Sequence, residues 1–366
     1  MAAPPPSPGI VKFSILLEAQ ISEPTPEGER RLFRDCIEQV TLADELGYHA
    51  VWATEHHGLF EFSHSSAPEC LLSFAAARTR RIRIGHGVTL TPGRYNHPIR
   101  VAERIATLDI LSEGRVNWGS GKSSTRVERE AFEIDSDTVH DQWLEALEMI
   151  PRMWRSDVFE WKGRFYRIPP TSIVPKPVQK PHPPLFVACS QPQTAVLAGS
   201  LGAGSLNFSA GTDAEIAERI RAYRVSATAA AQEGRRVNNH FACTPTVVVL
   251  PDDRRACEYG FRGGRFFAEC LGTYFFGGQR PVGPLDVTRD RLSPRALDEA
   301  MAARNREGSQ LVSINGDPSA ARETVSRYRA IGVDELILVM QLGTVPQEVV
   351  LESLRTFAEH VMPHFG

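Results

Sequence analysis

The sequence predicts an α/β fold, a single (β/α)8 TIM barrel with insertions. Eight short apolar segments suit strands buried on both faces, helical patterns separate them, and a length of 366 residues fits one such barrel. Alternating strand and helix patterns imply a parallel sheet, and eight strand–helix units close into a barrel. One barrel over residues 11–366 is therefore favoured over the two domains that length alone suggests.

The strand candidates are apolar runs at residues 11–17, 50–54, 82–90, 115–120, 184–188, 205–208, 241–250 and 334–341. Helices are expected at 27–46, 68–81, 98–111, 140–154, 214–232, 254–276 and about 350–361. In the first helix, Phe33, Ile37 and Val40 share one face, and Gly47 ends it where a left-handed residue is favoured. A small hairpin is expected over 158–168.

Two segments do not fit the barrel pattern. Residues 1–10 are rich in proline, which blocks helix formation, and they predict a short disordered arm. Residues 277–308 lack an obvious strand and contain several prolines and glycines. Structureless segments of this length are usually functional or mobile, so we expect a mobile active-site insertion that acts as a lid.

Composition excludes several function classes. The 41 basic and 44 acidic residues give a net charge of -3, which provides no bulk attraction to nucleic acid or an anionic membrane. The chain has no apolar run of membrane-spanning length and does not begin like a secretory signal. Its 6 cysteines form no C-x-x-C pair, which argues against a zinc site or disulfide framework and favours the reducing cytoplasm.

Two motif-like segments are rejected on their spacing, and a third motif is absent. Residues 119–123 resemble the end of a phosphate-binding P-loop, but Val116 stands where that motif needs glycine. The turn is still suited to cradling a phosphate. No G-x-G-x-x-G follows a strand, which excludes a Rossmann nicotinamide site. Residues 55–57 read E-H-H rather than H-E-x-x-H, and no third metal ligand stands at helical spacing, so no metal is expected.

Chemically informative residues follow the strands, where barrel enzymes place their active sites. The ordered pattern is E-H-H at 55–57, H-P-I-R-V-A-E at 97–103, L-D-x-L-S-x-G-R at 108–115, P-K-P-V-Q-K-P-H-P-P at 175–184 and V-A-x-S at 187–190. Together these segments resemble the bacterial luciferase-like flavin monooxygenase superfamily over residues 12 to 365. The resemblance implies a (β/α)8 barrel that binds FMN at its carboxyl-terminal mouth.

The resemblance also implies catalytic residues. His56 matches the catalytic-loop histidine of the superfamily, and an imidazole that titrates near neutral pH can move a proton to or from a flavin–oxygen adduct or its target. Glu55 is expected to orient a histidine, and His57 to be structural or a pocket wall. From the residues alone, a hydrogen-bonded structural histidine pair is the competing interpretation.

Cofactor contacts are implied in the same way. Gly87 and Val88 match a cis peptide behind the flavin ring, with a tight barrel glycine as the alternative interpretation. Lys122 falls where luciferase has an arginine near the phosphate, and Gly121 replaces a reactive cysteine, which does not favour light emission. The full set of expected cofactor-binding residues is Gly87, Val88, Gly121, Lys122, Ser123, His140, Ala188, Ser190, Gln193 and Thr194.

Aromatic residues near the strand ends are candidates for the wall of a substrate pocket, although such side chains more often belong to a core. They are Phe60, Phe62, Trp118, Phe275 and Phe276.

The leading hypothesis is a two-component monooxygenase. A separate NAD(P)H:flavin reductase would supply FMNH2, and O2 would form a flavin C4a-hydroperoxide that oxygenates a small organic substrate. One alternative is deazaflavin-dependent hydride transfer on the same barrel. Another is a non-catalytic flavin-binding partner subunit, against which the retained E-H-H segment argues. The resemblance also implies a homodimer.

Overall fold

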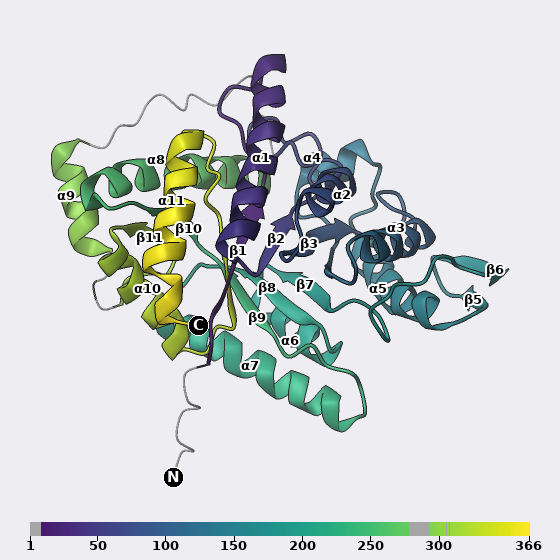
Figure 1. Ribbon diagram of the computed structural model, residues 1–366. Coiled ribbons are helices and arrows are strands. Elements are labelled where there is room, and N and C mark those ends of the chain that lie inside the picture. The colour runs from purple at the N-terminus through teal and green to yellow at the C-terminus, as the bar shows by residue number, and fades with distance from the viewer. Residues whose placement is uncertain (1–8, 278–292, 305, 307) are drawn as a thin grey trace, which may run out of the picture.

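The computed structural model describes residues 9–277, 293–304, 306 and 308–366. Eight parallel strands close into a barrel at the centre of the molecule, in the order β1-β12-β9-β8-β7-β4-β3-β2 (Figure 1). The predicted (β/α)8 barrel is thereby confirmed, with all eight expected strands in it. Their bounds are β1 (Lys12–Leu17), β2 (Ala50–Ala53), β3 (Arg83–Leu90), β4 (Val116–Gly121), β7 (Leu185–Cys189), β8 (Gly204–Phe208), β9 (Phe241–Thr244) and β12 (Glu335–Leu338).

Helices surround the barrel, and α1 and α11 pack side by side on one flank (Figure 1). Thr25 caps the amino end of α1 and Gly47 ends it with a φ of 83°, as its sequence predicts. The helices are α1 (Pro26–Leu46), α2 (Pro68–Arg78), α3 (Pro98–Leu111), α4 (Arg126–Ala131), α5 (Val139–Arg155), α6 (Pro192–Ser200), α7 (Asp213–Gln232), α8 (Asp253–Leu271), α9 (Pro294–Ala303), α10 (Pro318–Ala330) and α11 (Gln347–His360).

Two small sheets lie outside the barrel. One is the expected hairpin of β5 (Phe159–Lys162) and β6 (Arg167–Thr171). The other pairs β10 (Thr246–Val249) with β11 (Ser313–Gly316). The single strand expected at 241–250 was therefore wrong: Pro245, which lacks an amide hydrogen, separates β9 in the barrel from β10 in the second sheet.

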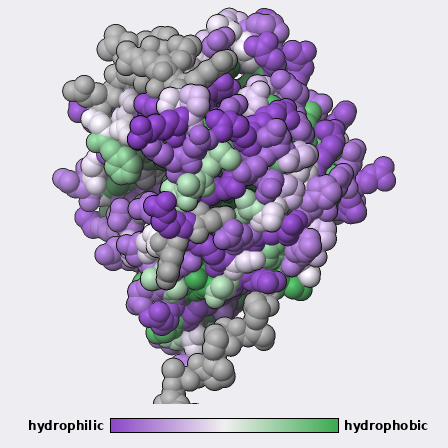
Figure 2. Space-filling model, turned by 90° about the vertical axis from the view of Figure 1, so that its left-hand side faces the viewer, coloured by the Kyte–Doolittle hydropathy of each residue, from purple (hydrophilic) through white to green (hydrophobic). Residues whose placement is uncertain are grey.

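Several elements were not predicted, among them α4, β11, α9 and α10. Helix α9 lies inside the segment 277–308, whose described part is thus helical rather than irregular. The remainder of the predicted lid, 278–292 with 305 and 307, lies outside the described residues, as do residues 1–8 of the predicted arm. Figure 2 shows that the side bearing α8 and α9 is mainly hydrophilic, with only small apolar patches.

A buried carboxylate closes the amino-terminal end of the barrel. Glu335, with a fully buried side chain, accepts hydrogen bonds from Ser14 Oγ at 2.5 Å and Trp52 Nε1 at 2.9 Å, and its other oxygen lies 2.7 Å from His240 Nε2. Burial opposes ionisation, but the hydrogen bond and charge of His240 prevail and lower the pKa of Glu335 to about 2. Residues at this end of a TIM barrel serve stability rather than catalysis.

We therefore expect Glu335→Ala to lower the free energy of unfolding by about 3–5 kcal/mol, because it leaves buried polar partners without their acceptor. Urea denaturation measures the loss. Because the folded-state pKa is depressed, the contribution of Glu335 is present above pH 4.5 and disappears as the pH falls toward 2. The exposed Glu45→Ala is the control, expected within about 0.5 kcal/mol of wild type. Equal free energies of unfolding for the two variants would contradict the stabilising role assigned to Glu335.

Candidate active site

A cavity opens at the carboxyl-terminal end of the barrel and contains about 1100 Å³ of empty space, including its mouth. This volume suits a site for a small organic molecule. Residues in or just after each of the eight barrel strands line it. One residue for each strand, in chain order, is Glu18, His56, Val88, Lys122, Ser190, Phe208, Thr244 and Ile337.

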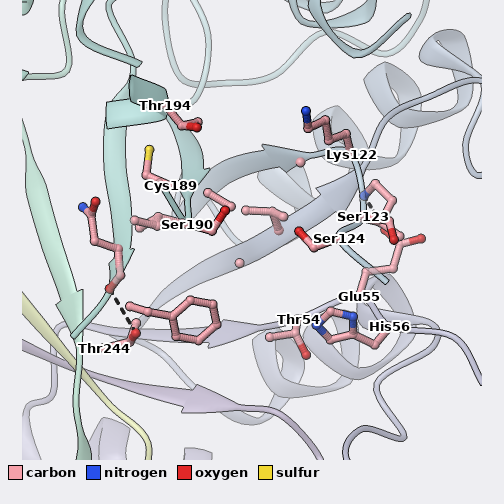
Figure 3. A pocket seen from close by; sticks show the side chains of 18 of the residues that line it. Thr54, Glu55, His56, Lys122, Ser123, Ser124, Cys189, Ser190, Thr194 and Thr244 are labelled. Carbon is pink, nitrogen blue, oxygen red and sulfur yellow. Dashed lines mark hydrogen bonds between the residues drawn. The ribbon is translucent and has the colours of Figure 1, made fainter. Parts of the chain in front are cut away.

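Most residues singled out from the sequence meet at this cavity. Those that line it are Glu55, His56, Gly87, Val88, Gly121, Lys122, Ser123, His140, Ala188, Ser190, Thr194 and Phe275. Those that do not line it are His57, Phe60, Phe62, Trp118, Gln193 and Phe276. In Figure 3, Glu55 and His56 lie at one side of the cavity, while Lys122 and Thr194 lie at the other.

His56 is held between two carboxylates. Its Nδ1 lies 2.9 Å from Glu128 Oε1, and its Nε2 lies 3.6 Å from Glu18 Oε1. Burial alone would disfavour the imidazolium, but the charge and hydrogen bond of Glu128, followed by the charge of Glu18, raise the pKa of His56 to about 9. His56 is therefore protonated at neutral pH and donates a hydrogen bond to Glu128.

The two carboxylates differ in their environments. Glu128 is fully buried and also accepts hydrogen bonds from the His57 amide, Ser123 Oγ and Thr125 Oγ1, at 2.9, 2.5 and 2.6 Å. Burial opposes ionisation, but the charge and hydrogen bond of His56, followed by the hydrogen bonds of Ser123 and Thr125, lower the pKa of Glu128 to about 2. Burial dominates at Glu18 and raises its pKa. Environments that push neighbouring pKa values apart are typical of acid–base sites.

Sequence reasoning missed both Glu18 and Glu128, although each carries a signal. Glu18 directly follows β1, at a strand end where barrel enzymes place functional groups. Glu128 stands at the fourth position of T-x-x-E, a pattern typical of helix starts, and α4 begins there with Thr125 as its cap.

Glu55 orients His57 rather than His56. Its Oε1 accepts from Asn96 Nδ2 at 2.8 Å and lies 3.2 Å from His57 Nε2, while its Oε2 accepts from the Leu90 amide at 2.8 Å. The His57 ring stacks on Tyr95, with centroids 6.3 Å apart, and does not line the cavity. These contacts tie the ends of β2 and β3 together, so the histidine that Glu55 contacts is His57, and His57 takes a structural position outside the cavity.

The opposite side of the cavity offers the Lys122 ammonium, an imidazole, hydroxyls and a helix start. Lys122 Nζ lies 3.2 Å from His140 Nδ1, and burial lowers the pKa of both groups. Ser190 and Thr194 flank the first turn of α6, where backbone amides point outward. Gln193 belongs to the same turn without lining the cavity. This donor set suits a phosphate.

Apolar residues of the adjacent strands β3, β4 and β7, namely Gly87, Val88, Gly121 and Ala188, also line the cavity. The Gly87–Val88 peptide bond is cis. A Cβ built on Gly121 would meet Val88 Cγ2 at 2.5 Å and the Cβ of Ala188 at 3.9 Å, so any larger residue at position 121 would have to displace Val88. An apolar ring system that carries an anionic tail suits these apolar residues and the anion-binding side together.

The structure corrects four of the five expected substrate-wall residues. Trp118 points outward from the barrel and packs edge-on against Trp154 of α5, with ring centroids 5.2 Å apart. Phe62 is fully buried behind His56. Phe60 and Phe276 are 48% and 84% exposed. Phe275 alone among the five lines the cavity.

A metal cluster and a membrane-spanning helix are both absent from the ranges that the structure describes. No group of three or more His, Cys, Asp or Glu side chains there is arranged to hold a metal ion. Among those residues, no helix combines the length and apolarity needed to cross a bilayer.

The barrel and its cavity define a cofactor-binding enzyme site, with a titratable histidine facing an anion-binding side. The luciferase-like monooxygenase family model matches residues 11–335. This chain belongs to that family.

Individual relatives agree with this placement. The oxygenase component of a flavin-dependent trigonelline monooxygenase from Acinetobacter baylyi is 26% identical, over 97% of this chain and 96% of its own. An F420-dependent hydroxymycolic acid dehydrogenase from Mycobacterium tuberculosis is 32% identical over 61% of each chain. The crystal structure of the monooxygenase RslO1 from Streptomyces bottropensis superposes with a TM-score of 0.82 at 27% identity, over 97% of this chain and all of that one.

Proposed function

We propose that this protein is the FMN-using oxygenase component of a two-component monooxygenase. One observation carries the proposal: a single cavity combines a protonatable histidine between two carboxylates with a side that carries Lys122 and several hydroxyls. A separate NAD(P)H:flavin reductase would supply the reduced flavin, as the family resemblance and the trigonelline relative suggest.

Each part of the cavity then has a task. Reduced FMN, when bound, would supply the activation of O2 through a C4a-(hydro)peroxide. Lys122, His140, Ser190 and Thr194 would hold its phosphate, and the apolar residues around Gly121 would accept its ring. His56 would deliver or receive a proton beside the substrate, and the buried barrel wall would exclude water.

Stopped-flow spectroscopy tests the proposal. Protein mixed anaerobically with FMNH2 is exposed rapidly to O2 while the flavin spectrum is recorded. A long-lived flavin–oxygen adduct supports an oxygenase, and candidate substrates are then sought among compounds that hasten its decay. Immediate return of oxidised FMN, with or without candidate substrates, contradicts the proposal.

A deazaflavin-dependent oxidoreductase is the second candidate, because a relative that matches 61% of this chain is F420-dependent. Parallel binding titrations with FMN and F420 distinguish the two. The carboxylate-flanked His56 argues against a non-catalytic flavin-binding subunit, since such a subunit has no need of a proton-transfer group.

Lys122→Ala is expected to weaken FMN binding about tenfold while changing riboflavin binding by less than about twofold, because a phosphate contact is worth one charge-assisted hydrogen bond. Fluorescence titrations with the two flavins measure both constants. The exposed Lys162→Ala, on β5 outside the cavity, is the control. An equal loss for FMN and riboflavin would place the phosphate elsewhere.

We also propose a cytoplasmic homodimer. All 6 cysteines are free, and 5 of them are buried, which is consistent with a reducing compartment. Large apolar side chains are exposed on neighbouring helices, including Phe33 on α1 and Phe74 on α2, at 40% and 57% exposure. Sedimentation equilibrium tests the dimer, and a monomer at micromolar concentration contradicts it.

A further inference from the structure

Three aromatic rings meet at the His56 end of the cavity. The ring of Phe275 lies edge-on to the His56 imidazole, with centroids 5.7 Å apart and planes at 87°. The Phe62 ring lies 5.8 Å from His56 and 5.5 Å from Phe275, again in edge-on geometry. Phe62 is fully buried, whereas Phe275 lines the cavity. Phe275 is therefore the aromatic face that a molecule beside His56 would meet.

Phe275 is held in this position from another part of the chain. It belongs to the π-helical turn Gly272–Phe276, which follows α8 directly. The preceding residue, Tyr274, is buried and donates its hydroxyl to Glu61 Oε2 at 2.7 Å. Glu61 is also buried and lies in the segment between β2 and α2 that carries His56. One hydrogen bond across 213 positions thus fixes the turn on the His56 segment.

The turn separates two adjacent phenylalanines. Phe275 faces the cavity and His56, while Phe276 is 84% exposed. A π-helical turn is rare and occurs frequently at functional sites, because it changes the direction of side chains relative to the preceding helix. Here it follows an α-helix and leaves one ring in the cavity and the next ring outside it.

We propose that Phe275 is a specificity-determining residue that closes the His56 side of the cavity and limits the group beside the imidazole to a narrow one. The Phe62 and Phe275 rings pack against His56 on this side, so a bulky group beside the imidazole would have to displace the Phe275 ring. Only one part of the inference rests on the proposed function, namely the reaction that the group beside His56 undergoes. The closure itself is a property of the folded chain.

Alkylation of His56 tests the closure without flavin or O2. Bromoacetamide is a small probe and 4-nitrophenacyl bromide a bulky aromatic one, and peptide mass spectrometry measures the rate of each at His56 at pH 9. We expect Phe275→Ala to raise the rate with the bulky probe about tenfold, since deleting the ring leaves a cavity beside the imidazole. The rate with the small probe should rise by no more than about twofold.

Phe276→Ala is the matched control, and both of its rates should equal those of wild type. Phe275→Leu, a milder change, should also raise the rate with the bulky probe more than the rate with the small probe, but by less than Phe275→Ala does. Tyr274→Phe should change the two rates in the same direction, because it loosens the turn. The inference would be overturned if the ratio of the bulky-probe rate to the small-probe rate were the same in Phe275→Leu, Phe275→Ala and Phe276→Ala. Suppose that the small probe alkylates His56 in wild-type protein faster than the bulky probe does, but that the protein forms no flavin–oxygen adduct. This result would refute the proposed monooxygenase function and leave the closure by Phe275 standing.

Discussion

Replacing His56 by alanine is expected to reduce substrate turnover by about 10²–10⁴-fold, the usual contribution of a positioned general acid or base. His56 lines the cavity, has 16% of its side chain exposed, and is protonated at neutral pH through Glu128 and Glu18. Its removal takes away the one imidazole placed between carboxylates in this cavity. Turnover is measured as substrate-dependent O2 consumption with a flavin reductase and NADH, using a compound that hastens adduct decay.

His64→Ala provides the control. His64 lies in the same segment between β2 and α2 but contacts the Phe60 carbonyl, 2.7 Å away, and does not line the cavity. We expect its turnover within about twofold of wild type. Added imidazole should restore part of the activity of His56→Ala, because the deletion leaves space beside the two carboxylates. Full activity in His56→Ala would remove the proton-transfer role and leave His56 as a structural residue.

The alternation of strands and helices made the barrel predictable, but not the second sheet. Residues 246–250 are as apolar as any barrel strand, so the pattern assigned them to the barrel; only Pro245 marks the break. Strand β11 was missed because Ile314 is the single large apolar side chain in Ser313–Gly316. Short strands in minor sheets bury too little to impose a pattern on the sequence.

Positions at strand ends were the predictable part of the site, because a parallel barrel brings all such ends to one mouth. Hydrogen-bond partners were harder to predict from the sequence, because they can lie far apart in it. Glu128 lies 72 positions from His56 and reaches it from the short helix α4. Trp118 shows a different failure. Gly119 and Gly121 face the barrel interior, so alternation along β4 places Trp118 on the outside, against α5.

The charge of His56 depends on Glu128, which leads to a second large effect. Glu128→Gln is expected to lower the pKa of His56 from about 9 to below 6.5, because burial then opposes the imidazolium without the main opposing charge. The substitution keeps the size of the side chain and an acceptor for Ser123 and Thr125. Nuclear magnetic resonance titration of ¹³C-labelled histidine measures the pKa, and the pH profile of turnover should shift with it.

Stability should follow the same titration. Because the folded-state pKa of His56 is raised, its contribution to stability is complete below the unfolded pKa of 6.5 and is lost as the pH rises through 9. The gap in unfolding free energy between wild type and Glu128→Gln should therefore narrow between these values. Glu130→Gln, an exposed neighbour on α4 that pairs with Arg126, should leave the His56 pKa unchanged. A His56 pKa near 9 in Glu128→Gln would show that Glu18 alone suffices to hold the proton.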